Sequence, residues 1–172
     1  MNYAAIKNCD IANGLGVRVS LFVSGCQHHC PNCFNAVAWD FKYGEVFTKE
    51  VEETILELLK PDYINGLSLL GGEPFEPENQ STILSFLKAV KECYPCKDIW
   101  CYTGFTLEEL LGGSRAATKY VREILGFLDV LVDGRFIEQY KDITLKFRGS
   151  SNQRIIDLKR SREERKIVFL EM

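Results

Sequence analysis

The stretch VRVSLFVSGCQHHCPNCFN, residues 17–35, joins a short apolar run to a loop rich in cysteine and histidine. Residues 17–23 have the length and the β-branched composition of a buried strand. The loop that follows carries Cys26, Cys30 and Cys33 in the spacing Cys-x3-Cys-x2-Cys. Three thiolates leave one position open at a metal centre that takes four ligands. The stretch therefore predicts a strand that ends in a metal-binding loop.

Strands and helices alternate after this point in the sequence. Apolar runs predict further strands at residues 66–71, 98–102, 129–133, 154–158 and 166–171. Helical spacing of apolar residues predicts helices at residues 48–60, 78–94, 106–111 and 115–125, with Thr48 as the N-cap of the first. The alternation predicts an α/β fold with mostly parallel strands in a single domain, residues 1–172. So few units favour an incomplete TIM-type β/α barrel or an open sheet over a closed barrel of eight strands.

Unusual polar and glycine-rich stretches follow each of the first four predicted strands. They are the cysteine loop, GGEP (71–74), TGF (103–105) and DGRF (133–136). Active residues of such folds lie in loops after the carboxyl ends of strands. We therefore expect the four stretches to converge at one end of the sheet.

The composition is that of an ordinary globular protein, with 46% hydrophobic residues, 26% charged residues and a net charge of -3. This charge gives no reason to expect a nucleic-acid partner. The basic segment LKRSREERK (158–166) also contains two glutamates and is interpreted as a solvated surface element. With no apolar run of membrane-spanning length and no signal-peptide pattern, we expect a cytoplasmic protein without a membrane partner.

The cysteine count favours metal ligation or catalysis over disulfides. Seven cysteines would leave one unpaired, and cytoplasmic thiols are kept reduced. A four-iron cluster on the three loop cysteines would keep one iron open for an outside ligand. A zinc site with His28 or His29 as fourth ligand is the alternative, although it would not explain the other loops. Protein purified without oxygen should be brown with an iron cluster and colourless with zinc.

The remaining cysteines and the two histidines are given lesser roles. Cys93 and Cys96 form a C-x-x-C pair away from the predicted active end and are interpreted as incidental. Cys9 and Cys101 are interpreted as buried thiols. His28 and His29 are interpreted as residues that shape the loop.

The cysteine spacing followed by GGEP resembles the radical S-adenosylmethionine enzymes. The resemblance implies a [4Fe-4S] cluster on Cys26, Cys30 and Cys33, with S-adenosylmethionine on the open iron. Gly71 and Gly72 let backbone approach a ligand closely, and Glu73 is predicted to contact the ammonium group of that cofactor.

The segments 13–35 and 148–157 resemble most closely the activating enzymes of anaerobic, class III ribonucleoside-triphosphate reductases. This resemblance covers about residues 10–158. It implies a glycyl radical made on the large subunit of such a reductase, with an electron donor such as flavodoxin. Two alternatives are a small-molecule radical enzyme, as in deazapurine biosynthesis, and a zinc-binding module. The first usually has a different cysteine spacing.

The resemblance also implies further cofactor-binding residues. Asn32 stands where many relatives carry an aromatic residue against the adenine, and Phe34 is expected to supply that apolar surface. Asp133 and Arg135 resemble an Asp-x-Lys pair beside the cofactor, and Asp133 is a candidate for a monovalent cation. Thr103 marks the neighbouring strand end. Asn152 and Arg154 either line the site or orient the last strands.

Overall fold

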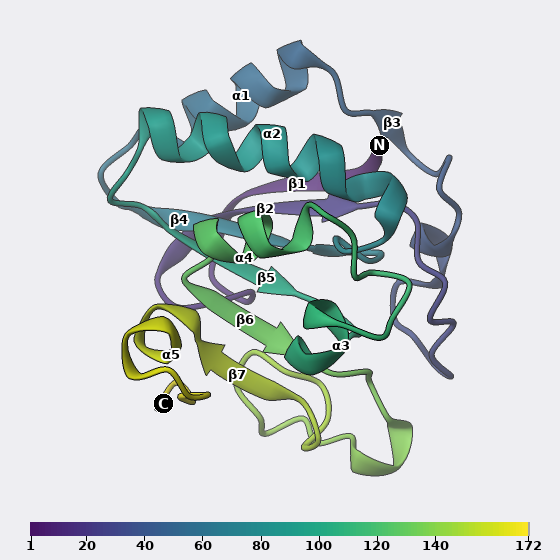
Figure 1. Cartoon of the computed structure of the whole chain (residues 1–172). Helices are drawn as coiled ribbons and strands as arrows, with labels where there is room; N and C mark the ends of the chain where they lie inside the picture. The colour runs from purple at the N-terminus through teal and green to yellow at the C-terminus, as the bar shows by residue number, and fades with distance from the viewer. Residues whose placement is uncertain (172) are drawn as a thin grey trace.

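The computed structural model describes residues 1–171 and has one seven-stranded sheet in the order β3-β1-β2-β4-β5-β6-β7 (Figure 1). The four central strands run parallel and are β2 (Val17–Val23), β4 (Ile64–Gly71), β5 (Asp98–Tyr102) and β6 (Val130–Asp133). They confirm the strands predicted at these places. The sheet ends at β3 and β7 and is not closed, so the fold is mixed α/β and an incomplete TIM-type barrel stays a prediction.

The outer strands are antiparallel to their neighbours, so the sheet is mixed and its parallel part is the centre. They are β1 (Asn2–Asp10), β3 (Glu45–Val46) and β7 (Arg154–Asp157). Six residues separate β1 from β2, and a parallel crossover needs a dozen or more. The short connection therefore forces the antiparallel pairing, and the sequence reading missed β1 altogether.

The main helices lie on one face of the sheet (Figure 1). They are α1 (Lys49–Leu59), α2 (Pro77–Cys93) and α4 (Val121–Phe127), and the other two helices are α3 (Leu107–Leu111) and α5 (Leu158–Glu164). Two single turns of 3-10 helix complete the described elements, η1 (Ala36–Trp39) and η2 (Glu138–Tyr140). The predicted cap of α1 is confirmed, since the Thr48 side chain accepts a hydrogen bond from the Val51 N–H. No helix within residues 1–171 is both long enough and apolar enough to cross a membrane.

Two predicted elements differ from the structure. The helix predicted at residues 115–125 begins only at Val121, because Gln80 of α2 donates to the Ala116 carbonyl at 2.8 Å and holds it out of a helix. Residues 166–171 form a single bridge from Phe169 to Ile156 instead of a strand. After α5 the chain turns at Arg165 with a φ of 52°, so only a short part of the segment reaches β7.

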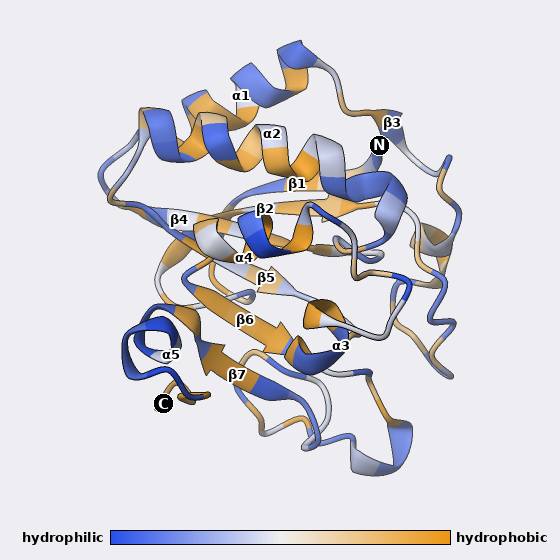
Figure 2. Ribbon diagram, viewed as in Figure 1, coloured by the Kyte–Doolittle hydropathy of each residue, from blue (hydrophilic) through white to orange (hydrophobic). Residues whose placement is uncertain are grey.

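The core lies between the sheet and the α1, α2 and α4 layer. In Figure 2 β6 is strongly hydrophobic, whereas α1 and α2 alternate between hydrophobic and hydrophilic turns. The largest cluster of buried side chains includes Leu21, Leu67, Leu69, Phe86 and Ile99. Burial of apolar surface between these layers fixes the strands, and the loops after them carry the site.

Candidate functional site

The four predicted stretches meet at the carboxyl ends of the parallel strands, around one cavity of about 510 Å³. Cavities that bind small molecules usually have about 300–1,000 Å³. Its lining draws on every one of the stretches and includes Cys26, Gly72, Thr103 and Gly134. The expected convergence is therefore confirmed.

Most of the predicted site residues line this cavity. They are Cys26, Cys30, Asn32, Cys33, Phe34, Gly71, Gly72, Glu73 and Thr103. Asp133 and Arg135 are not among the lining residues. The contacts of any of these residues with a cofactor stay predictions.

The cysteine loop is closed by hydrogen bonds to the turn η1. Gly25 N–H donates to the Ala38 carbonyl at 2.8 Å, and Cys26 N–H donates to the Trp39 carbonyl at 3.2 Å. Gly25 has a φ of 94°, and a Cβ there would lie 2.3 Å from the Phe41 ring. Only glycine fits this close turn, which brings the first cysteine directly over the end of β2.

Of the three loop cysteines, Cys26 is buried, and Cys30 and Cys33 are half-buried. Burial raises the pKa of Cys26 to about 12. Burial also raises the pKa of Cys30, and the neighbouring charge of Cys33 adds to the effect. Such thiols keep their protons unless a metal displaces them. Three soft sulfur donors in one loop fit the requirements of an iron–sulfur cluster.

A single metal ion fits the loop less well. No three His, Cys, Asp or Glu side chains of the described chain surround one point closely enough to hold an ion. A four-iron cluster does not need this, because each thiolate binds a different iron. His28 and His29 also have other contacts, with Glu73 and with the Trp39 ring. The donor set therefore favours the cluster over the zinc alternative.

Gly71 and Gly72 are required by the protein's own backbone. A Cβ on Gly71 would lie 2.6 Å from the Val23 carbonyl oxygen, and one on Gly72 would lie 2.6 Å from the Gly25 carbonyl oxygen. Gly71 also has a φ of 112°. The close approach predicted here is therefore to β2 and the cysteine loop. An approach to a ligand stays a prediction.

Glu73 is almost completely buried, with 1% of its surface exposed. Its Oε1 accepts hydrogen bonds from the Thr103 hydroxyl and the Phe75 N–H, both at 2.8 Å. Its Oε2 accepts one from the Gly104 N–H at 2.8 Å and contacts His28 Nε2 at 3.0 Å. A carboxylate has about four lone-pair sites, so this one is saturated.

Asp133 is fully buried and bound by Arg154. The guanidinium donates to both of its oxygens, at 2.8 and 2.5 Å, and the Leu107 N–H donates to the second at 2.7 Å. Arg154 also hydrogen-bonds Glu108 and thereby lowers the pKa of that carboxyl to about 2. The structure thus supports the orienting alternative for Arg154.

Arg135 does not pair with Asp133. Gly134 turns the chain after β6 with a φ of 97°, and the Arg135 side chain is exposed. Its carbonyl accepts a hydrogen bond from the Asn152 amide at 2.8 Å. Asn152 therefore anchors the loop after β6.

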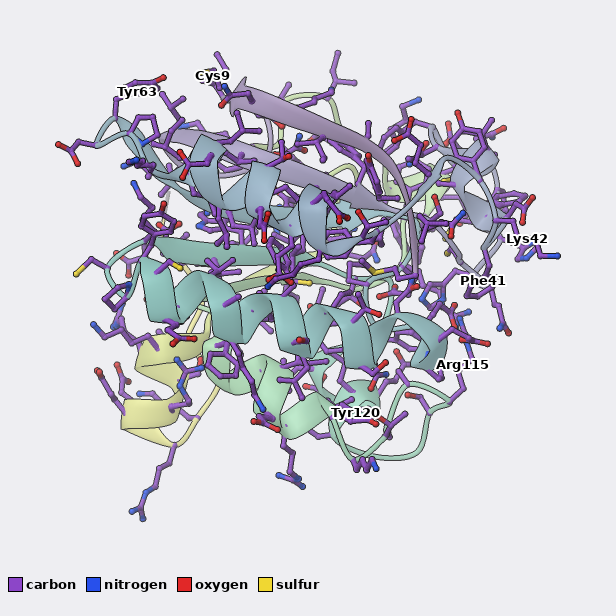
Figure 3. All side chains as sticks on the ribbon, turned by 90° about the horizontal axis from the view of Figure 1, so that it is seen from above. Cys9, Phe41, Lys42, Tyr63, Arg115 and Tyr120 are labelled. Atoms are coloured by element: carbon purple, nitrogen blue, oxygen red, sulfur yellow. The ribbon has the colours of Figure 1, made fainter. Side chains whose placement is uncertain are left out.

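Another buried carboxylate, Glu76, is not predicted from the sequence. Glu76 accepts two hydrogen bonds from Arg115, at 2.7 and 3.0 Å, and one from the Gln27 N–H at 2.8 Å. Burial raises the pKa of Glu76, but the bonds from Arg115 and Gln27 outweigh burial and lower it. Arg115 also lies 4.6 Å from the Phe105 ring. Figure 3 places it at the same end as Phe41, which packs on the cysteine loop. The partners are far apart in the sequence, so no local pattern reveals them.

The other cysteines lie away from the cavity. Cys93 and Cys96 are exposed at the end of α2, and Cys101 is buried as predicted. The prediction for Cys9 is wrong because it is exposed. A register shift between Lys7 and Asp10 and a φ of 53° at Cys9 interrupt the regular strand. Figure 3 shows Cys9 at the end opposite Phe41 and Lys42.

Comparisons with known proteins agree with this site. A family model described as a 4Fe-4S single cluster domain matches residues 12–156. The anaerobic ribonucleoside-triphosphate reductase-activating protein of Vibrio cholerae is 44% identical over 89% of this chain and 96% of its own length. Proteins of the same name from Escherichia coli K12 and Enterobacteria phage T4 are 41% and 39% identical. They cover 89% and 90% of this chain and 96% and 93% of their own lengths.

Proposed function

Because this chain belongs to the family of anaerobic ribonucleoside-triphosphate reductase-activating proteins, we propose that it activates such a reductase by forming a glycyl radical on it. The observation that carries the proposal is the meeting of three cysteines with the loops after β4, β5 and β6 in one cavity. When bound, a [4Fe-4S] cluster supplies the electron that cleaves S-adenosylmethionine, and the resulting radical takes hydrogen from a backbone glycine.

The chain's own residues hold and shield these groups. Cys26, Cys30 and Cys33 would bind three corners of the cluster as thiolates. The backbone of Gly71 and Gly72 and the side chains of Asn32 and Phe34 line the space beside them, where S-adenosylmethionine would lie. Cys26 is buried, so the protein shields its sulfur atom from water.

The rim of the cavity suits a protein substrate. Phe34 is 89% exposed and Ile143 is 90% exposed, and both line the cavity. Apolar side chains exposed beside a cavity are typical of a surface that another protein covers. A glycine-bearing segment of the reductase would cover them as it enters.

Several finer points belong to the same proposal. A donor such as flavodoxin would reduce the cluster, and the protein would act in the cytoplasm, where thiols stay reduced. We retain the incomplete TIM-type barrel, since parallel strands with helices on one face are the arrangement expected of part of such a barrel. A monovalent cation at Asp133 is not included, because Arg154 and the Leu107 N–H already bond both carboxylate oxygens.

The test is an activation assay without oxygen. Reduced protein with S-adenosylmethionine should install a carbon-centred radical on the large reductase subunit. The doublet in its electron paramagnetic resonance spectrum should collapse when the glycine α-hydrogen is replaced by deuterium. The variants Cys26→Ala, Cys30→Ala and Cys33→Ala should lose cluster absorbance and activation, whereas Cys93→Ala should retain both. A reductase that stays free of radical, while the protein cleaves the cofactor on a small metabolite, would overturn the proposal.

A further inference from the structure

Two adjacent histidines of the cysteine loop have different surroundings. The His28 side chain is 2% exposed, and its Nε2 lies 3.0 Å from Glu73 Oε2. His29 is exposed and rests on the Trp39 ring, with 4.6 Å between ring centroids. Only His28 points inward, although both lie between the first two cysteines.

The His28 ring occupies a slot formed by the loop after β5. The Phe105 ring meets it edge-on, with 4.4 Å between centroids. A Cβ on Gly104 would lie 2.6 Å from His28 Cδ2 and 2.7 Å from Nε2. The loop therefore has no room for a side chain at position 104 unless the imidazole moves.

Glu73 joins His28 to two other loops. Its four contacts come from His28 in the cysteine loop, from Phe75 after β4, and from Thr103 and Gly104 after β5. With its hydrogen on Nε2, the His28 ring donates a hydrogen bond to Glu73 Oε2. An ammonium group could bond Glu73 only by displacing one of these donors.

We propose that His28 is a positioning residue which, through Glu73, fixes the cysteine loop against the loops after β4 and β5. Glu73 then acts by holding the cysteines in place, and not by binding the ammonium group of S-adenosylmethionine. The inference rests on the proposed function only where it concerns the cluster. The positioning itself is a property of the chain without the cluster.

The rival explanation is that His28 binds the metal. Its Nδ1 is buried and has no hydrogen-bond partner within residues 1–171, so it is the atom that such a ligand would use. Substitution of His28 by glutamine or by asparagine distinguishes a positioning role from metal binding. The glutamine amide nitrogen is the same number of bonds from Cβ as imidazole Nε2, and the asparagine amide nitrogen or oxygen matches Nδ1.

The first experiment uses protein without iron and measures the alkylation rate of Cys26 by mass spectrometry. Loss of a hydrogen bond to a charged group should raise this rate roughly 10- to 100-fold in His28→Ala. His28→Gln should restore much of the protection, and His28→Asn should not. His29→Ala is the matched control and should react like the wild type. Rescue by His28→Asn alone, or equal rates in all variants, would overturn the proposal.

The second experiment measures iron loss from the reconstituted protein to a ferrous chelator, without S-adenosylmethionine. Removing a group that orients metal ligands typically costs about 10- to 100-fold in metal affinity. His28→Ala and Glu73→Gln should therefore both lose iron faster. The double variant should be little worse than the more severe single one, since both changes break the same contact. A Glu73→Gln protein with unchanged iron loss and only a weaker affinity for S-adenosylmethionine would overturn the proposal.

The two experiments separate this inference from the proposed function. A wild type that binds no cluster refutes the function, while the alkylation rates still decide the role of His28. If the wild type has a stable cluster and the variants behave like the wild type, the inference is refuted and the proposed function is not.

Discussion

The substitution Gly72→Ala tests whether the GGEP turn is fixed by packing against the cysteine loop. The added methyl would lie 2.6 Å from the Gly25 carbonyl oxygen and 2.8 Å from that of Ala38. Both neighbours are backbone atoms, so no flexible side chain can yield to the methyl group. The Gly25 oxygen also accepts a hydrogen bond from the Glu73 N–H at 2.8 Å, which the methyl would disturb.

The expected cost follows from these contacts. Overpacking of this kind costs about 1–3 kcal/mol. The disturbed hydrogen bond adds about 1 kcal/mol. For a chain of this length, the sum of about 2–4 kcal/mol should lower Tm by roughly 4–16 °C.

Thermal unfolding of the iron-free protein, followed by circular dichroism, measures this change. Iron content after reconstitution should fall as well, because the methyl displaces the loop that carries Cys26. Gly126→Ala is the matched control, since Gly126 lies in α4 and a Cβ there meets nothing within 4 Å. It should raise stability slightly. A Gly72→Ala protein with normal Tm and iron content but weak binding of S-adenosylmethionine would show that position 72 faces the cofactor instead.

Three further predictions follow from the site. Arg154→Ala leaves the buried Asp133 carboxylate without its cation and should cost about 3–5 kcal/mol in urea unfolding, part of which Asp133→Asn should restore. Burial raises the pKa of Cys26 from 9.0 to about 12. The contribution of this thiol to the unfolding free energy is therefore complete below pH 9 and is lost as the pH rises toward 12. The unfolding free energy of iron-free Cys26→Ser should therefore fall less steeply than that of the wild type across this window. Ile143→Ser should weaken the apparent affinity for the reductase, by roughly 30-fold if Ile143 is a binding hot spot. It should leave cofactor cleavage without the reductase unchanged, and equal losses in both assays would count against a docking rim.

Local pattern predicts the centre of the sheet better than its edges. The residues of β2 and β4 are almost all buried, and most of them are apolar, so both strands are recognised from the sequence. β1 is only half-buried, contains Lys7 and Asn8, and lacks such a run. Residues 166–171 have the composition of a strand, but composition does not show whether a partner is within reach.

Some features of the site follow from a local sequence pattern, and others depend on contacts between residues that are distant in the sequence. The spacing of the cysteines is contained in eight consecutive residues, and it predicts the loop correctly. The partners of the buried carboxylates are distant in sequence, since Glu73 bonds His28 and Glu76 bonds Arg115. Arg154 replaces the nearer Arg135 at Asp133 because Gly134 turns the chain. Only the folded backbone selects among such partners.

The buried carboxylates Glu73, Glu76 and Asp133 also explain how an open sheet keeps its loops in place. Glu73 joins the cysteine loop to the loop after β5, and Glu76 joins it to the loop before α4. Asp133 joins the end of β6 to α3 and β7. A buried charge is costly unless all of its partners are present, so losing one donor weakens the whole group of contacts. The loops therefore cannot move independently, and a cofactor or a glycine-bearing segment meets a preformed cavity.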